Sequence, residues 1–307
     1  MKTVNSFVIK GDEVVLIDCG EDTDASFHAL QSGLKEHGLL FTDIDRIILT
    51  HAHVDHCGMS ERVAAASSAE VWVSEKMWDW ALRPQELWAD REALMMPALI
   101  GYFEEKVRPL ILGGYEQMMG SVKNVWHPVK EDRLKLFDSE GALEIDGKEW
   151  RVLYMPGHSQ TQSTFFHVAS GSYLSADMLL KITPTPVIER SLEHPGERNK
   201  GIVQMMESYK RLMTYDIHKV YPGHYEHFTN FREVIDAQTS RIYDRAEDTY
   251  QLIKSGNHYF FPLYQQLYEG RFSMPAMIMM IGYLDLLEEQ GRIISEKVND
   301  QLQFRVT

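Results

Sequence analysis

The chain has 307 residues, 44% hydrophobic and 25% charged, which is the balance of an ordinary globular protein and excludes a fibrous or fully disordered one. Its formal net charge of −14 disfavours polyanionic partners held by charge alone, although the net charge does not reveal a local basic patch. It holds no run of 18 apolar residues, so we expect no membrane span.

The first segment predicts a β-hairpin, because apolar runs at residues 4–9 and 13–18 flank the turn Lys10-Gly11-Asp12. This charged turn follows too soon after the N-terminus for a signal peptide. Only two cysteines occur, Cys19 and Cys57, and reduced thiols are the usual state of so few cysteines in the cytosol. We therefore expect a cytoplasmic protein.

A helix, a strand and a metal-ligand motif follow. Residues 24–37 have the apolar spacing of a helix, with Leu30 and Leu34 on one face. Residues 44–49 predict a buried strand, and a helix is predicted from residue 59. The stretch "THAHVDHCG" at residues 50–58 therefore lies on a tight strand-to-helix loop. Residues 69–74 predict another strand.

The loop is crowded with side chains that bind metal ions. His51 and His53 lie two positions apart, and an extended segment directs both rings to the same side. Asp55 and His56 fall on the turn and face another direction. Imidazole nitrogens and carboxylate oxygens are good ligands for Zn²⁺ and similar ions, so one loop can serve two adjacent metal positions. A capping loop of ordinary hydrogen-bonded histidines is the alternative interpretation.

Residues 75–120 predict a helical insertion, since they are rich in Trp, Met and Leu but interrupted by prolines and by a Gly-Gly pair. Two roles for this insertion stay open. It can simply pack against the rest of the fold, or it can form a lid or pocket wall beside the histidine loop.

Strand signals return at residues 149–154, 163–168 and 173–176, followed by a helix at 201–214 and a strand at 218–221. Three of these apolar runs end in His158, Asp177 and His224, at the kind of strand end where α/β scaffolds assemble sites. Pro-Gly before each late histidine predicts a tight turn. Alone, each would more often be a packed or surface histidine or a helix-capping aspartate; together with the loop they predict the remaining ligands.

The last third predicts mainly helices, including a Met-rich one at 275–289, and ends in a predicted hairpin over 292–306. Helix plus hairpin is typical of a winged-helix element. Residues 228–307 contain 8 basic and 11 acidic residues, whereas a winged element that binds nucleic acid would normally be basic.

The motifs "NSFVIKGDEVVLIDCG", "HAHVDH", "PGHS", "SAD" and "YPGH", in this order over residues 3–227, resemble the metallo-β-lactamase superfamily. The resemblance implies an α/β fold with a four-layer αββα sandwich at 1–227, including the insertion at 75–120. Residues 228–307 would form a mainly helical, winged-helix-like element. The chain departs from the family pattern after His158, where many members carry proline or glycine following the Ser or Thr, and at Ala176, where glycine is common.

The resemblance also implies the ligand sets. The first metal would be bound by His51, His53 and His158, the second by Asp55, His56 and His224, with Asp177 bridging the two. Asp18 would support the site without binding metal. Two divalent ions are implied as cofactors, with zinc favoured and iron or manganese as alternatives.

The function implied is that of a glyoxalase II-like or related hydrolase. A metal-bridging hydroxide would attack a small-molecule ester, thioester or related substrate, with Asp55 as metal ligand and catalytic residue. Two alternatives stay open: a metal-dependent endoribonuclease, which the acidic C-terminal region disfavours, and a non-catalytic, metal-stabilised regulator.

Overall fold

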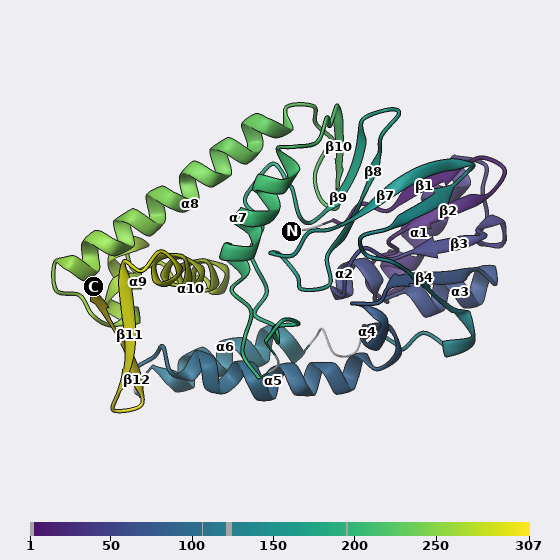
Figure 1. Cartoon of the computed structure of the whole chain (residues 1–307). Coiled ribbons are helices and arrows are strands. Elements are labelled where there is room, and N and C mark those ends of the chain that lie inside the picture. The colour runs from purple at the N-terminus through teal and green to yellow at the C-terminus, as the bar shows by residue number, and fades with distance from the viewer. Residues whose placement is uncertain (1–2, 106, 121–124, 195) are drawn as a thin grey trace.

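In the computed structural model, which describes residues 3–105, 107–120, 125–194 and 196–307, two five-stranded sheets pack face to face with helices on their outer sides (Figure 1). This is the expected αββα sandwich. None of the helices within these ranges has the length and hydropathy needed to cross a bilayer.

The first sheet has the order β1-β2-β3-β4-β5 and is parallel apart from its first pair. Its strands are β1 (Phe7–Lys10), β2 (Val14–Ile17), β3 (Arg46–Ile48), β4 (Glu70–Ser74) and β5 (Leu134–Phe137). The helices α1 (Asp24–Glu36), α2 (Val54–Cys57) and α3 (Ser60–Ser67) connect its parallel strands. The predicted hairpin, the predicted helices and the two predicted strands are confirmed, whereas β5 was not anticipated.

The second sheet has the order β10-β9-β8-β7-β6, with only its β9–β10 pair parallel. Its strands are β6 (Ala142–Ile145), β7 (Lys148–Tyr154), β8 (Ser163–His167), β9 (Ser172–Ala176) and β10 (Lys219–Pro222). Helix α7 (Gly201–Leu212) makes the crossover between the two parallel strands. Here the sequence predicted every strand except β6.

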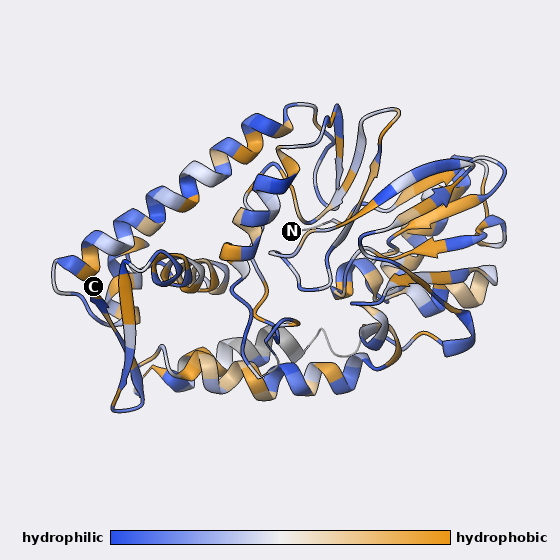
Figure 2. Ribbon diagram, viewed as in Figure 1, coloured by the Kyte–Doolittle hydropathy of each residue, from blue (hydrophilic) through white to orange (hydrophobic). Residues whose placement is uncertain are grey.

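Strand β2 is apolar at every position because both of its faces are buried. Val15 and Ile17 point into the core between the two sheets, where they pack with residues such as Phe165 from the second sheet. Leu16 points the other way and packs with the cluster that includes the helices. A strand covered on both faces must be apolar at every position, and Figure 2 shows the strands of this sheet largely in the hydrophobic colour.

The insertion and the C-terminal region supply most of the helical mass (Figure 1). The insertion contains α4 (Trp78–Leu82), α5 (Pro84–Ile100) and α6 (Arg108–Gly120). The C-terminal region contains α8 (Phe231–Lys254), α9 (Phe260–Leu267), α10 (Met274–Glu289) and the hairpin β11 (Ile293–Val298) and β12 (Gln301–Val306). The predicted hairpin is confirmed, while its likeness to a winged helix stays a prediction.

An ion pair with a buried carboxylate links these regions. Arg198, from the loop before α7, donates from both terminal nitrogens to the carboxylate of Asp285 on α10, one of the two bonds being 2.7 Å long. The same guanidinium donates to the hydroxyl of Tyr102 in the insertion at 2.6 Å. The insertion also accepts a hydrogen bond from the Leu302 amide of β12 at Gly101. Packing against the C-terminal region is thus one role of the insertion.

Candidate metal centre

The histidine loop starts where β3 ends, and Asp18 at the end of β2 holds it. The Asp18 carboxylate accepts hydrogen bonds from the Thr50 amide at 2.9 Å and the Thr50 hydroxyl at 2.8 Å. It also lies 2.8 Å from Nδ1 of His56. Asp18 is 2% exposed, so one buried carboxylate fixes both ends of the loop. These contacts are those expected of a supporting residue.

His51, His53 and His158 form the first group of converging nitrogens. Nδ1 of His53 lies 3.0 Å from Nε2 of His51 and 2.9 Å from Nε2 of His158, which comes from the loop after β7. Burial lowers the pKa of all three imidazoles, and their mutual proximity lowers it further for His51 and His53. Neutral imidazole is the form that binds metal, so the environment favours the ligating state.

Asp55, His56 and His224 form the second group, whose ligand atoms lie within 4.8 Å of one another. Nε2 of His224, which follows β10, is 3.3 Å from the Asp55 carboxylate. Burial alone would lower the pKa of His224, but the carboxylates of Asp177 and Asp55 outweigh it and raise that pKa to about 9. The Asp55 side chain is 41% exposed, whereas those of His56 and His224 are almost fully buried.

Asp177 lies between the two groups. Its Oδ2 is 3.5 Å from Nε2 of His158 and 3.3 Å from Nε2 of His224, while its Oδ1 is 3.3 Å from Nε2 of His56. One carboxylate therefore faces both groups, as a bridging ligand must. Residues 178–194 form no helix, so the interpretation of Asp177 as a helix cap is wrong.

The turns before the late ligands allow this approach. A Cβ at Gly223 would lie 2.3 Å from Oδ1 of Asp177 and 2.7 Å from Cε1 of His56, so only glycine fits there. Ala176 has a φ of 43°, in the left-handed region that favours glycine.

The outer nitrogens of the histidines are held by other residues. His51 Nδ1 lies 2.9 Å from the Thr50 hydroxyl, and His158 Nδ1 lies 2.9 Å from the Thr185 carbonyl. His224 Nδ1 contacts the Thr3 carbonyl. Such outer contacts fix the tautomer and the ring orientation of metal-binding histidines.

The inward-facing atoms fit a pair of cations. Within the described ranges, Nε2 of His56, Nε2 of His224 and Oδ1 of Asp177 are buried and have no hydrogen-bond partner. Buried polar atoms are normally satisfied, and a divalent ion held by the second group and Asp177 would satisfy these. All seven candidate ligands offer nitrogen or oxygen, a donor set that suits zinc and also iron or manganese.

Sequence reasoning missed Glu189. This buried carboxylate accepts hydrogen bonds from the Gln160 amide at 2.7 Å and the Ser159 hydroxyl at 3.3 Å. Its other oxygen lies 3.9 Å from Nε2 of His53, the one outer histidine nitrogen without a hydrogen bond in the described structure. Glu189 lies in an irregular loop with no periodic pattern, so no sequence signal marked it.

The two cysteines are packed rather than ligating. Both are free and buried, and the Cys57 thiol donates to the His53 carbonyl at 3.0 Å. Burial raises the pKa of each thiol above its ordinary value.

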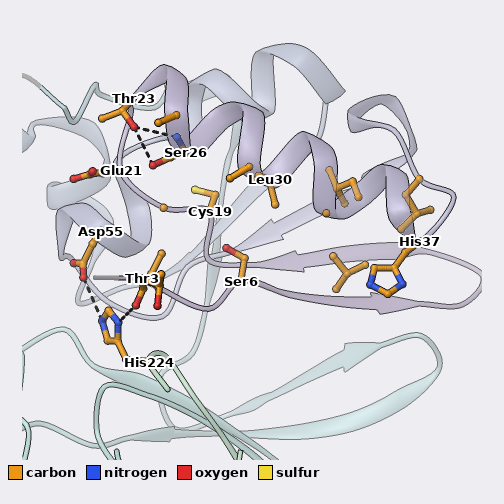
Figure 3. A pocket seen from close by; sticks show the side chains of 18 of the residues that line it. Thr3, Ser6, Cys19, Glu21, Thr23, Ser26, Leu30, His37, Asp55 and His224 are labelled. Atoms are coloured by element: carbon orange, nitrogen blue, oxygen red, sulfur yellow. Dashed lines mark hydrogen bonds and ion pairs between the residues drawn. The ribbon is translucent and has the colours of Figure 1, made fainter. Parts of the chain in front are cut away.

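A long cavity of about 1020 Å³ opens at the second group (Figure 3). It begins at Asp55 and His224 and runs between α1 and the first strand as far as Lys10 and His37. No residue of the insertion lines it, among those the structure describes, so the cavity gives no support to the lid interpretation of the insertion.

The sandwich fold and a buried cluster of histidines and aspartates at the strand ends define the class as metallo-hydrolases. The chain belongs to the metallo-beta-lactamase superfamily, whose family model matches residues 2–224.

Known relatives cover nearly the whole chain. A Bacillus subtilis (strain 168) protein named "Probable metallo-hydrolase YqjP" is 27% identical over 97% of this chain and 92% of its own length. Two crystal structures share the fold. The metallo-beta-lactamase family protein TTHA1429 of Thermus thermophilus has a TM-score of 0.78 and 24% identity over 99% of this chain and 94% of its own. A beta-lactamase domain protein of Burkholderia ambifaria has a TM-score of 0.79 and 18% identity, covering 99% and 88%.

Proposed function

We propose that this protein is a binuclear metal-dependent hydrolase of a small carbonyl ester or thioester. The observation that carries the proposal is the position of Asp177, whose carboxylate faces both histidine groups, with Oδ2 beside His158 and His224 and Oδ1 beside His56. In this proposal the metal ligands are His51, His53 and His158 on one side, Asp55, His56 and His224 on the other, and Asp177 between them. Zinc as the resident metal, glyoxalase II-like chemistry and a cytoplasmic location belong to the same proposal.

Two bound divalent ions would lower the pKa of a water molecule toward neutrality and polarise the carbonyl that it attacks. The chain's own residues do the rest. Asp55 is the ligand most exposed toward the cavity, so its free carboxylate oxygen can orient the water and hold its proton. Asp18 and the Thr185 carbonyl keep the rings of His56 and His158 in place while charge develops.

The cavity favours a neutral carbonyl substrate over a polyanion. Glu21 and Asp55 line its inner end, and the lysine that lines it, Lys10, lies at the far end. A phosphodiester backbone reaching the metal centre along this cavity would bring its negative charge beside Glu21. Together with the acidic C-terminal region, this charge pattern makes the endoribonuclease the second candidate.

The test combines metal analysis with a substrate panel of oxygen esters, thioesters, lactones, phosphodiesters and RNA. The metal-loaded protein should cleave a carbonyl ester or thioester, and chelation or His53→Ala should remove both metal and activity. His194→Ala, at an exposed histidine far from the motifs in sequence, is the matched control. Metal content and activity that persist in His53→Ala would refute the proposal, and cleavage of RNA alone would favour the nuclease.

A further inference from the structure

The long cavity is a groove whose inner end is the metal centre. Its lining follows α1 along its full length, from Thr23 before the helix to His37 after it. A helix of 13 residues is about 20 Å long, so the groove extends well beyond what a small acyl group would fill. Figure 3 shows Asp55 and His224 at one end, Leu30 and Ser6 midway, and His37 at the other end.

The chemistry of the walls changes along the groove. Near the metal centre they are mostly polar, with Thr3, Thr23 and Ser26, and Ser6 adds a hydroxyl midway along the groove. Farther along they are apolar or small, formed by Val8, Ala29, Leu30, Gly33, Leu34 and Leu39. Among the residues that the structure describes, formal charges line the groove only at its two ends, with Glu21 and Asp55 at the inner end and Lys10 at the outer end. A neutral, unbranched hydrocarbon chain matches the long middle section.

Small residues on α1 keep the groove open. Ala25, Ala29 and Gly33 are spaced by four, which puts them on one face of the helix, and all three line the groove. A Cβ at Gly33 would meet no atom within 4 Å, so the space beside it is free. Val8 on the opposite wall is 39% exposed and presents an apolar side chain to the groove.

We infer that the substrate is an ester or thioester of a long, unbranched acyl chain. The acyl chain lies in the groove along α1, and its carbonyl reaches the metal centre. This inference rests on the proposed hydrolase function. Hydrolysis breaks the bond from the acyl carbon to sulfur or oxygen and forms a new bond to the water oxygen. It releases the carboxylate, the thiol or alcohol, and one proton.

The first experiment is a chain-length series on the metal-loaded, full-length protein. Acetyl, butyryl, octanoyl, dodecanoyl and palmitoyl thioesters of one thiol would be compared by kcat/KM. Full burial of a methylene corresponds to about fourfold in binding, and a groove open on one side should give about twofold per methylene. A flat series with good acetyl activity would overturn the groove inference and leave the proposed hydrolase intact.

The matched variants are Gly33→Leu, which fills the groove, and Ser32→Leu, which adds the same side chain at the neighbouring exposed position that does not line it. Both favour the helix, so folding should be kept; Ala29→Leu is the second groove variant. The ratio of dodecanoyl to acetyl kcat/KM should fall at least tenfold in Gly33→Leu and Ala29→Leu but not in Ser32→Leu. Equal ratios in all of them would contradict the inference.

A binding measurement separates this inference from the proposed function. Dodecanoate binding, followed by calorimetry, should be weakened by Gly33→Leu whether or not turnover occurs. Binding of this kind without cleavage of any ester or thioester would support the groove and refute the hydrolase. A concentration-dependent dimer that Gly33→Leu dissociates, with a flat chain-length series, would identify the groove as an interface between copies instead.

Discussion

The two sides of the metal centre differ in how the chain encloses them. On the first side, His51 and His158 are almost fully buried, and the loop at 185–189 covers the group through the Thr185 carbonyl and the Glu189 carboxylate. On the second side, Asp55 is 41% exposed and opens on the long groove. The first side is therefore shielded from solvent, and the second is the side that a substrate reaches.

The supports on the two sides also come from different parts of the chain. His224 is held by the Thr3 carbonyl, and the Asn5 amide donates to the Gly223 carbonyl at 2.7 Å, so the N-terminal segment supports the open side. On the closed side, Arg91 of α5 donates to the Ile188 carbonyl at 2.9 Å, beside Glu189. We expect changes on the closed side to act mainly on metal retention and changes on the open side mainly on turnover.

Asp177→Ala should have the largest effect, because it removes the carboxylate that faces both sides. We expect metal content to fall at both positions and kcat/KM to fall by more than about 100-fold, beyond the loss typical of an outer contact. Elemental analysis after gel filtration measures the metal content, and ester hydrolysis measures kcat/KM. Asp216→Ala, which removes a carboxylate that is 90% exposed, is the control. Two retained metals in Asp177→Ala would show that Asp177 is not shared.

Gly223→Ala should weaken mainly the open side. The added methyl would displace Asp177 Oδ1 or His56 Cε1, and overpacking of this kind costs about 1–3 kcal/mol. We expect one metal equivalent to be lost, with activity reduced at least about tenfold. Gly113→Ala in α6, where a Cβ meets nothing within 4 Å, should leave both unchanged. Loss of both metals from Gly223→Ala would mean that the two sides do not act separately.

Glu189→Gln should weaken the closed side. Glutamine keeps an oxygen for the Gln160 amide but removes the charge that faces Nε2 of His53. We expect metal affinity on the closed side to fall about tenfold, as for other outer contacts of metal-binding histidines. Competition with a chelating dye measures this affinity. Glu193→Gln, an exposed change in the same loop, is the control. Equal affinities in both variants would rule out a role for Glu189.

Much of this centre could be predicted from the sequence because its ligands follow short motifs at strand ends. His158 lies 105 residues from His53 and follows a strand of the other sheet, yet both motifs follow strand ends at the same edge of the sandwich. Strands β5 and β6 escaped prediction because each has four residues with charged or exposed positions among them. Such short runs give little periodic signal.

Glu189 and the groove could not be predicted, for a different reason. Glu189 is defined by its tertiary contacts with the Gln160 amide and the Ser159 hydroxyl, on a loop 29 or 30 residues earlier in the chain. The groove depends on the gap left between α1 and the first strand. Both elements were predicted correctly, but nothing in their sequences fixes how closely they approach.

Ala176→Gly should have the smallest effect and completes the comparison on the open side. The left-handed φ of Ala176 costs about 1–2 kcal/mol, which glycine would relieve. Two losses oppose this gain. Glycine loses more conformational entropy on folding, about 0.5–1 kcal/mol, and the buried methyl group is lost, about 0.8 kcal/mol. We therefore expect the free energy of unfolding, from urea denaturation, to change by less than about 1 kcal/mol.

The contrast with Gly223 is informative because the two residues are hydrogen-bonded, the Gly223 amide donating to the Ala176 carbonyl at 2.7 Å. A methyl group is tolerated at Ala176 because its burial offsets the backbone strain that it causes. The same methyl at Gly223 meets two candidate ligands directly. A change above about 2 kcal/mol in Ala176→Gly would show that the Ala176 methyl itself positions Asp177, and the open side would then be as tightly packed as the closed one.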